Sequence, residues 1–356
     1  MSQTTTLVES SVVAQELLGA SRTDTGQRVR RRGGGSRLGF LATYLFTVFL
    51  LVTLNFLLPR LMPGDPISAL VDGSSPSYVQ SESTRTALEA YYGLNRPLAA
   101  QYLSYLGDLA HGDLGMSIRY NVPVSQLITE RLPWTLLLLG TAMVLSVSIG
   151  WVGGIQSGWR RNQPVDRGLL TVFMALKSFP VFFVGSLALF VLSVRLGWFP
   201  LAGAQTPFSD AVGLQRIGDI AHHLALPALV LALEFAGSEY LVMRAGMVSE
   251  LGADYLLLGR SKGLRDRRLK YRYAARNALL PVVALTAVHV AFAASGSILV
   301  ETVFAYPGIG RLTFDAISFR DYPTLQGCFL LLTMVVVTAN FLADALSRRL
   351  DPRTAT

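Results

Sequence analysis

Long runs of apolar residues, separated by shorter polar segments, dominate the chain from residue 40 onward. A helix that crosses a bilayer needs roughly 20 mostly apolar residues. The pattern therefore predicts an all-α polytopic membrane protein with about six transmembrane helices. The predicted spans are residues 40–60, 134–157, 169–194, 224–243, 281–300 and 325–346.

Composition supports lipid as the surrounding solvent. Of the 356 residues, 51% are hydrophobic and 15% are charged, whereas soluble domains carry about 25% charged residues. The chain has one cysteine, Cys328, which excludes an intrachain disulfide and a cysteine-based metal site. The net charge of +8 favours basic cytoplasmic loops over a nucleic-acid partner.

The distribution of basic residues predicts the orientation. With the N-terminus in the cytoplasm, most of the 31 Arg and Lys residues fall on inside segments, as the positive-inside rule requires. An even number of spans then places the C-terminus in the cytoplasm too. We therefore expect a multi-pass protein of the plasma or inner membrane with both termini inside.

The same pattern divides the chain into four parts. Residues 1–39 form a predicted disordered basic tail, and residues 348–356 a short cytoplasmic tail. Residues 40–133 hold the first span and an external segment with two helical stretches, Glu82–Tyr92 and Leu98–Leu109. Residues 134–347 form a five-helix core, which includes a long inside loop at 244–280.

Charges within the apolar runs are candidates for a transport pathway, since a charge in a span is costly and by default functional. Lys177 lies in the third span, where Pro180 could turn it toward a pathway, although a snorkelling lysine would also fit. Glu234 in the fourth span is the second candidate. Glu301 and Arg311 flank the predicted external mouth, where they would either pair with each other or shape a gate.

Histidine spacing does not support a metal site. His222 and His223 are adjacent, so on a helix they point about 100° apart. We place them at the external membrane interface. His289 is alone in the fifth span, where a structural hydrogen bond is expected.

No motif for nucleotide hydrolysis is present. A phosphate-binding loop needs Gly-Lys followed by Ser or Thr. The three lysines follow Leu176, Ser261 and Leu269, and none completes that motif. We expect the chain to be no enzyme and to bind no cofactor itself, so that any ATP and Mg would sit on partner subunits.

The inside loop 244–280 is the most charged part of the chain and has two helical stretches, Glu250–Leu258 and Asp266–Leu279. The second is expected to stop at Pro281, and Gly259 and Gly263 are expected to permit a bend between the two.

Leucines and a tyrosine distinguish this loop from a merely solvated basic one. Leu251, Tyr255 and Leu258 are spaced to share one helix face. Apolar side chains in an inside loop favour a docking surface for another protein.

Three short motifs in this loop resemble the EAA loop of binding-protein-dependent ABC importer permeases, specifically those of the dipeptide/oligopeptide/nickel branch. They are Asp254-Tyr255, Gly259-Arg260-Ser261-Lys262-Gly263-Leu264 and Arg276-Asn277-Ala278-Leu279-Leu280-Pro281. That branch usually has Ala at the positions of Gly259 and Ser261. Both replacements are small, so close approach to a partner is preserved.

The resemblance extends over most of the chain from about residue 40, and its other motifs occur in the expected order. They are Pro63-Gly64-Asp65-Pro66, Tyr92-Gly93-Leu94, Gly112-Asp113-Leu114-Gly115, Arg131-Leu132-Pro133, Glu301-Thr302-Val303-Phe304, Pro307-Gly308-Ile309-Gly310-Arg311, Arg320-Asp321-Tyr322-Pro323 and Asp351-Pro352-Arg353. The large segment after the first span is typical of the first of the two paired permeases.

The resemblance implies a type I ABC importer permease fold and an obligate assembly. Its partners would be a second homologous permease, two cytoplasmic ATPases, an external substrate-binding protein and membrane lipid. The residues implied to couple to the ATPase are Glu250, Asp254, Tyr255, Leu258, Gly259, Arg260, Ser261, Lys262 and Gly263.

Di- or oligopeptides are the expected substrate of such an importer, with nickel chelates, haem or another small solute as the alternative. A self-contained ion-coupled carrier is disfavoured, because the sequence has no duplicated halves. An intramembrane protease built on Ser295-Gly296-Ser297 is disfavoured for lack of a suitable His base.

Overall fold

The computed structural model describes residues 37–61, 86–87, 90 and 95–350. Regular structure in this part of the chain is helical, apart from an isolated bridge between Met116 and Pro123. The tail 1–36, the stretch 91–94 and residues 351–356 lie outside the described residues, and so does nearly all of the predicted helix Glu82–Tyr92.

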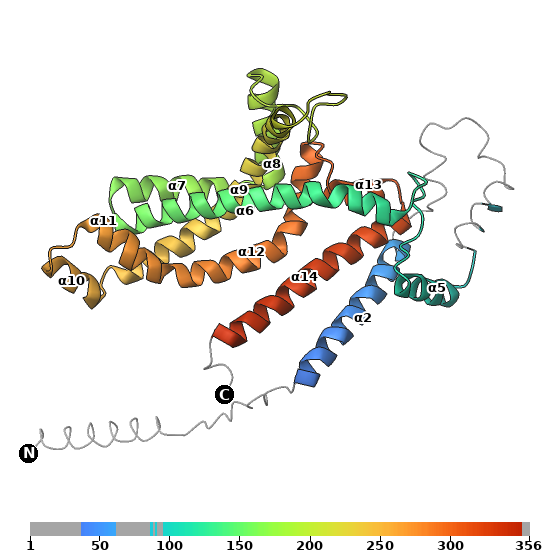
Figure 1. The fold of residues 1–356 in the computed structure, drawn as a ribbon, viewed down its shortest axis with the longest axis horizontal. Coiled ribbons are helices and arrows are strands. Elements are labelled where there is room, and N and C mark those ends of the chain that lie inside the picture. The colour runs from blue at the N-terminus through green and yellow to red at the C-terminus, as the bar shows by residue number, and fades with distance from the viewer. Residues whose placement is uncertain (1–36, 62–85, 88–89, 91–94, 351–356) are drawn as a thin grey trace, which may run out of the picture.

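Long helices form the body of the molecule, with α10 and α11 at one end and α5 at the other (Figure 1). We call these the α10 end and the α5 end. The elements are α2 (Arg37–Leu61), α5 (Leu98–Ala110), α6 (Val124–Trp159), α7 (Pro164–Ser178), α8 (Val181–Ala188), the π-helical η2 (Leu189–Arg195), α9 (Leu214–Glu250), α10 (Asp254–Ser261), α11 (Asp266–Arg268), the π-helical η3 (Leu269–Ala274), α12 (Ala275–Val303), α13 (Ile309–Ser318) and α14 (Tyr322–Leu350).

Each predicted span lies mostly in helix. Only some of these helices, however, are long and apolar enough to be identified as membrane spans. Among the described residues, α2, α6 and α9 are long and apolar enough to cross a bilayer. The consecutive helices α7 and α8–η2 supply a fourth crossing if they are taken together, and Tyr322–Thr338 of α14 is a shorter apolar helix. Large apolar side chains such as Phe46 and Leu45 on α2 stay 66% and 58% exposed, which suits a lipid-facing surface.

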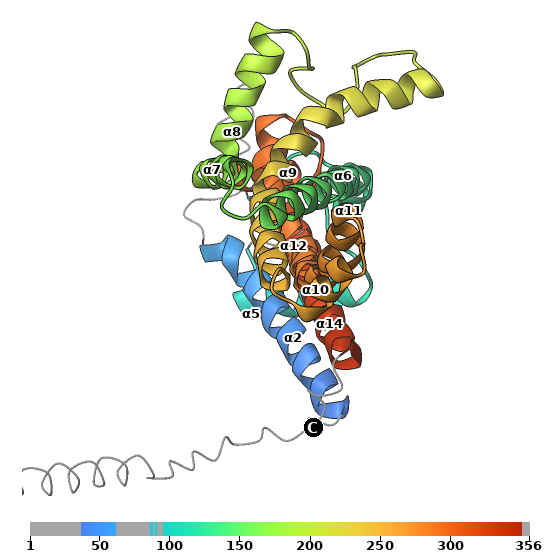
Figure 2. The same cartoon turned by 90° about the vertical axis from the view of Figure 1, so that its left-hand side faces the viewer.

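The third predicted span, residues 169–194, is broken at the position of Pro180. Its two halves, Pro164–Ser178 and Val181–Arg195, are bent by 100°, and Figure 2 shows α8 projecting away from the bundle. The break lies at Phe179, whose ψ of 137° is extended. A residue before proline is disfavoured in the α region, so Pro180 explains where the helix stops.

A stripe of glycines on α6 allows α9 to approach unusually closely. Gly150, Gly154 and Gly158 recur every fourth residue, and an added Cβ would lie 2.5, 2.6 and 2.4 Å from the Cβ atoms of Glu239, Met243 and Met247 respectively. Small residues at this spacing form the packing surface of many membrane helix pairs. This Gly-rich segment is therefore the surface of α6 that packs on α9.

The register of that contact determines how the helices run. Residue numbers rise together on both helices, from Gly150 opposite Glu239 to Gly158 opposite Met247, so α6 and α9 are parallel. The intervening α7–η2 segment must therefore carry the chain back to the start of α9. At 37 residues, α9 is about 55 Å long. This length exceeds the roughly 30 Å thickness of the hydrocarbon core of a bilayer.

A second helix pair, α2 and α14, lies beside the bundle (Figure 1). Asn55 donates a 2.8 Å hydrogen bond to the carbonyl of Gln326, and the Tyr44 hydroxyl lies 3.5 Å from Thr338 Oγ1 near the other end. Residue numbers rise on one helix as they fall on the other, so the two helices are antiparallel.

The loops at the α5 end are fastened by one buried carboxylate. Asp321 accepts hydrogen bonds from Ser117 Oγ at 2.5 Å, the Ile118 N–H at 3.1 Å and Thr324 Oγ1 at 2.7 Å. This side chain thus joins the segment that follows α5 to the start of α14.

The glycine stripe leads to a stability prediction. Gly154→Ala places a methyl group against Met243 and should lower the free energy of unfolding by about 1–3 kcal/mol. Gly140→Ala, on the same helix but with nothing within 4 Å of the added Cβ, should change it by less than about 1 kcal/mol. Thermal unfolding of the detergent-purified variants measures both. Equal melting temperatures for the two would contradict the close α6–α9 contact.

Candidate functional site: the loop between α9 and α12

The loop predicted to dock a partner begins where α9 ends, at Glu250, and contains α10, α11 and η3. The predicted first helix, Glu250–Leu258, is corrected to Asp254–Ser261. The predicted stop at Pro281 is also wrong, because α12 runs through this proline to Val303.

Gly263 ends α10 with the backbone geometry that glycine favours. Its φ is 74°, and its N–H donates to the Arg260 carbonyl at 2.9 Å. The N–H of Leu264 donates to the Gly259 carbonyl at 3.0 Å. Together these bonds form a Schellman motif, which satisfies carbonyls that the helix end would leave unpaired. The bend predicted at Gly263 is confirmed.

Gly259 does not bend the chain, which corrects the second half of that prediction. It is buried inside α10, and a Cβ there would lie 2.5 Å from Leu269 Cδ2. Leu256, 1% exposed, enters the same apolar cluster as Met243 and Met247 of α9. One side of α10 is thus anchored to the bundle through Leu256 and Gly259.

A small polar network holds the turn before α10. The Tyr255 hydroxyl donates to the Glu250 carboxylate, and Asn277 Nδ2 donates to the same oxygen at 3.4 Å. Burial, followed by the hydrogen bond to Glu250, raises the pKa of Tyr255 to about 12. The hydroxyl therefore remains a hydrogen-bond donor across the neutral and moderately alkaline range.

The other side of α10 is open. Leu257 and Leu258 are 68% and 55% exposed. Leu251, Tyr255 and Leu258 do not share a face as predicted, because Leu251 precedes α10 and Tyr255 turns back to Glu250. The remaining predicted coupling residues are exposed, namely Asp254, Arg260, Ser261, Lys262 and Gly263.

A buried ion pair near this loop was missed by the sequence analysis. Asp166, 2% exposed, accepts two hydrogen bonds from the Arg244 guanidinium at 2.7 and 2.8 Å. Ser157 donates to the same carboxylate and lies 2.6 Å from the Tyr240 hydroxyl. The pair joins α6, α7 and α9 just where α9 leaves the bundle. The only sequence signal for this ion pair is that Asp166 is an acidic residue in the first turn of a helix, where such residues are favoured.

The pathway candidates Lys177 and Glu234 lie on one exposed face of the bundle. Lys177 Nζ donates to Ser238 Oγ at 2.6 Å, and Ser238 is one turn from Glu234 on α9. Both side chains are exposed in this single chain. Neither is buried among apolar side chains, so this surface is available to a lumen or a partner.

Glu239, by contrast, faces inward and pairs with the lone histidine of α12. His289 Nδ1 and Thr286 Oγ1 each lie 3.0 Å from Glu239 Oε1. The expected hydrogen-bonded role of His289 is confirmed. Glu239 itself is fully buried.

Glu301 and Arg311 do not pair through their side chains. The buried Glu301 carboxylate accepts from the Arg311 backbone N–H at 3.0 Å and from Thr135 Oγ1 at 2.9 Å. The Arg311 guanidinium instead donates to the Ala305 carbonyl.

Glu301 therefore caps the N-terminus of α13, where a negative charge is stabilised by the helix dipole. Gly308 provides the space, since a Cβ there would lie 2.3 Å from Glu301 Oε2. This contact accounts for Gly308, the first of the two glycines in the Pro307–Arg311 motif.

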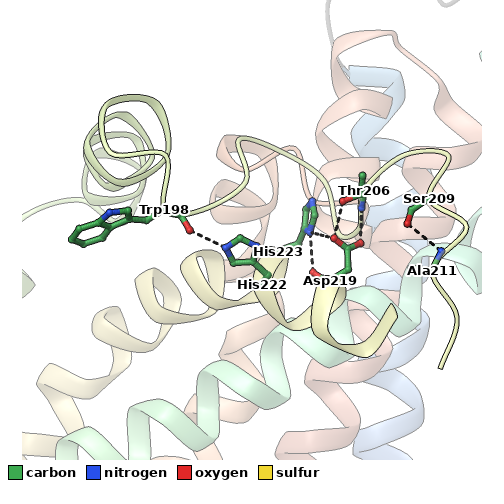
Figure 3. Close-up of polar contacts among 7 residues, drawn as sticks. All are labelled: Trp198, Thr206, Ser209, Ala211, Asp219, His222 and His223. Carbon is green, nitrogen blue, oxygen red and sulfur yellow. Dashed lines mark hydrogen bonds and ion pairs between the residues drawn. The ribbon is translucent and has the colours of Figure 1, made fainter. Parts of the chain in front are cut away.

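The two adjacent histidines bind separate partners near the start of α9 (Figure 3). His222 Nε2 lies 2.8 Å from the Trp198 carbonyl, and His223 Nδ1 lies 2.9 Å from the Asp219 carbonyl. Thr206 donates to the Asp219 carboxylate through its N–H and its hydroxyl, each at 2.7 Å. The arrangement fastens the loop before α9 to that helix.

The Glu301 cap can be tested by truncation. Glu301→Ala leaves the Thr135 hydroxyl and the Arg311 N–H without their acceptor and should cost about 1–3 kcal/mol of stability. Hydrogen exchange should accelerate across residues 309–318. The control is Glu130→Ala, at an exposed carboxylate of α6. Unchanged exchange in α13 would contradict the capping role.

Comparison with known proteins identifies the family of the chain. Residues 130–356 match the family model described as "Binding-protein-dependent transport system inner membrane component". A Brucella suis protein that is named as a peptide permease is 39% identical over 304 residues, which cover 85% of this chain and 93% of that protein.

Two further relatives are similar over nearly their whole length. The oligopeptide transport system permease protein AppB of Bacillus subtilis is 37% identical, covering 84% of this chain and 92% of its own. The di/tripeptide transport system permease protein DppB of Pseudomonas aeruginosa is 35% identical, covering 89% and 96%. The chain belongs to the family of binding-protein-dependent transport system inner membrane components, the permease subunits of ABC importers.

Proposed function

We propose that this chain forms half of the transmembrane pathway of an ATP-driven importer for short peptides and that α10 couples it to a separate ATPase. The observation that carries the proposal is the two-sided character of α10. Leu256 and Gly259 fix one side to the bundle, while Leu257 and Leu258 are exposed on a segment beyond the long helix α9. A helix fixed in this way can transmit a displacement that a partner applies to its open side.

The full assembly in this proposal contains a second permease, two ATPases that supply ATP and Mg, and an external substrate-binding protein. The absence of a Gly-Lys-Ser/Thr motif in the sequence supports a separate ATPase. The N-terminus, the C-terminus and α10 would lie on the cytoplasmic side, as the positive-inside rule predicts.

Short peptides are the proposed substrate because the three relatives above are named for peptides, oligopeptides or di/tripeptides. Nickel chelates are not favoured by these names. The pathway itself would pass the face that carries Lys177 and Glu234. Both are exposed there, beside the 100° break between α7 and α8.

If α10 docks the ATPase, changing its exposed leucines should weaken ATPase binding without destabilising the chain. The double variant Leu257→Ala/Leu258→Ala should weaken association with the ATPase roughly tenfold or more, since buried apolar anchors dominate interface energies. Its melting temperature should stay close to that of the unmodified chain, because both side chains are exposed. Co-purification of the ATPase with the tagged permease and thermal unfolding measure the two effects.

A matched control uses two leucines of similar exposure at the α5 end, Leu98 at 60% and Leu103 at 68%. Leu98→Ala/Leu103→Ala should leave ATPase association unchanged. Leu256→Ala should instead destabilise the chain by about 2–5 kcal/mol, as for other buried leucines. Retained ATPase binding in the Leu257/Leu258 variant would rule out α10 as the docking helix.

The substrate is tested separately in proteoliposomes. Uptake of a labelled tripeptide should require ATP, both permeases, the ATPases and the substrate-binding protein, and unlabelled dipeptides should compete with it. Uptake by this chain alone would overturn the proposal. Competition by nickel chelates but not by peptides would keep the importer and change its substrate.

A further inference from the structure

Three arginines line an open depression in the loop between α9 and α12. Arg265, Arg267, Arg268 and Tyr271 surround a volume of about 390 Å³. Arg267 and Arg268 lie four and three residues before Tyr271, so their side chains project to the same side of the helix. In the described part of the chain, none of these guanidinium groups forms an ion pair, although Asp266 lies between them in sequence.

One wall of the depression is held in place by the bundle. The Tyr271 hydroxyl accepts a 2.8 Å hydrogen bond from Gln156 Nε2 of α6. The neighbouring Lys270 faces inward, where its Nζ donates to Gln156 Oε1. Burial, followed by the nearby Arg160, lowers the pKa of Lys270. The lysine is thus part of the packing, and the arginines are left as the charged groups facing outward.

An apolar stretch of helix follows the depression along the chain. The chain continues from η3 into α12 at Ala275 without a break. Large exposed apolar side chains begin nine residues after Tyr271, with Leu280 at 78% and Val283 at 54% exposure. Tyr271 and Tyr273 are 44% and 39% exposed, and tyrosines concentrate at the level of lipid headgroups. Along the chain, basic, aromatic and apolar side chains therefore follow one another in that order.

We propose that this depression binds the phosphate of an anionic phospholipid headgroup. The planar guanidinium groups of Arg267 and Arg268 donate paired hydrogen bonds to phosphate oxygens, and the acyl chains lie along the exposed apolar side chains of α12. Basic pockets between helices at the membrane surface are suited to such headgroups. The site is distinct from the exposed leucines of α10, which are proposed to meet the ATPase.

A lipid headgroup bound in the depression would support α10 from the side. Leu269 lies between Arg268 and Lys270 and is the residue against which Gly259 of α10 packs. A headgroup held by the adjacent arginines thus fixes the element on which α10 rests.

The experiment compares lipid binding to the purified full-length chain by native mass spectrometry with phosphatidylglycerol and with phosphatidylcholine. The unmodified chain should prefer phosphatidylglycerol. In Arg267→Gln/Arg268→Gln this preference should fall about tenfold or more, because each basic residue near an anionic headgroup contributes substantially to binding.

The control variant is Arg272→Gln/Arg276→Gln, which removes the same charge from exposed positions of the same segment that do not line the depression. It should reduce the preference less than about threefold. An equal loss in both variants would show diffuse attraction to the basic surface and would overturn the proposal, as would no loss in either.

Two further measurements keep the proposal testable if a variant folds poorly or the surface meets a protein. A phosphatidylglycerol analogue with a photoreactive headgroup should label residues 265–271 of the unmodified chain, and labelling only elsewhere would refute the site. If Arg267→Gln/Arg268→Gln instead loses the ATPase on co-purification while keeping its lipid preference, the depression is an ATPase contact and the lipid assignment is wrong.

Discussion

Close contact between α6 and α9 determines the rest of the arrangement. Because Gly150, Gly154 and Gly158 have no side chains, the two helices meet backbone to backbone over three successive turns. Their parallel direction then requires the intervening chain to cross back, and the break before Pro180 shapes that return. The buried Asp166–Arg244 pair closes the same contact at the α10 end. Loss of this close approach would misplace both the bent helix and the loop that α9 presents.

Hydrophobic runs located the helices because lipid imposes a simple length requirement on each span. The hydrophobic runs could not predict where each helix ends. Helix α6 begins at Val124, ten residues before the predicted span, because its first turns pack on Ile309 and Leu312 of α13. The break at Phe179 was signalled by Pro180, but its 100° angle depends on packing against α9 and α12. Local pattern thus predicted where helices exist and not how far they extend.

The candidate site was predicted in its position and only partly in its geometry. Gly263 acted as predicted because a left-handed turn is a local property of one residue. Gly259 did not, because its role depends on Leu269, which folding brings to it. The contact of Glu301 with the N-terminus of α13 was likewise not visible in the sequence, because it too is formed by folding. Spacing alone also selected Leu258 for a shared face, whereas Leu256 is the leucine that is buried.

The uninterrupted passage from η3 into α12 has a mechanical consequence. Leu269, against which α10 packs, and Glu301 belong to one helical segment formed by η3 and α12. The Glu301 carboxylate caps the first turn of α13. Pro281, which cannot donate the helical hydrogen bond, lies between these two points of the segment. The segment from η3 to Glu301 thus links the element on which α10 rests to the first turn of α13.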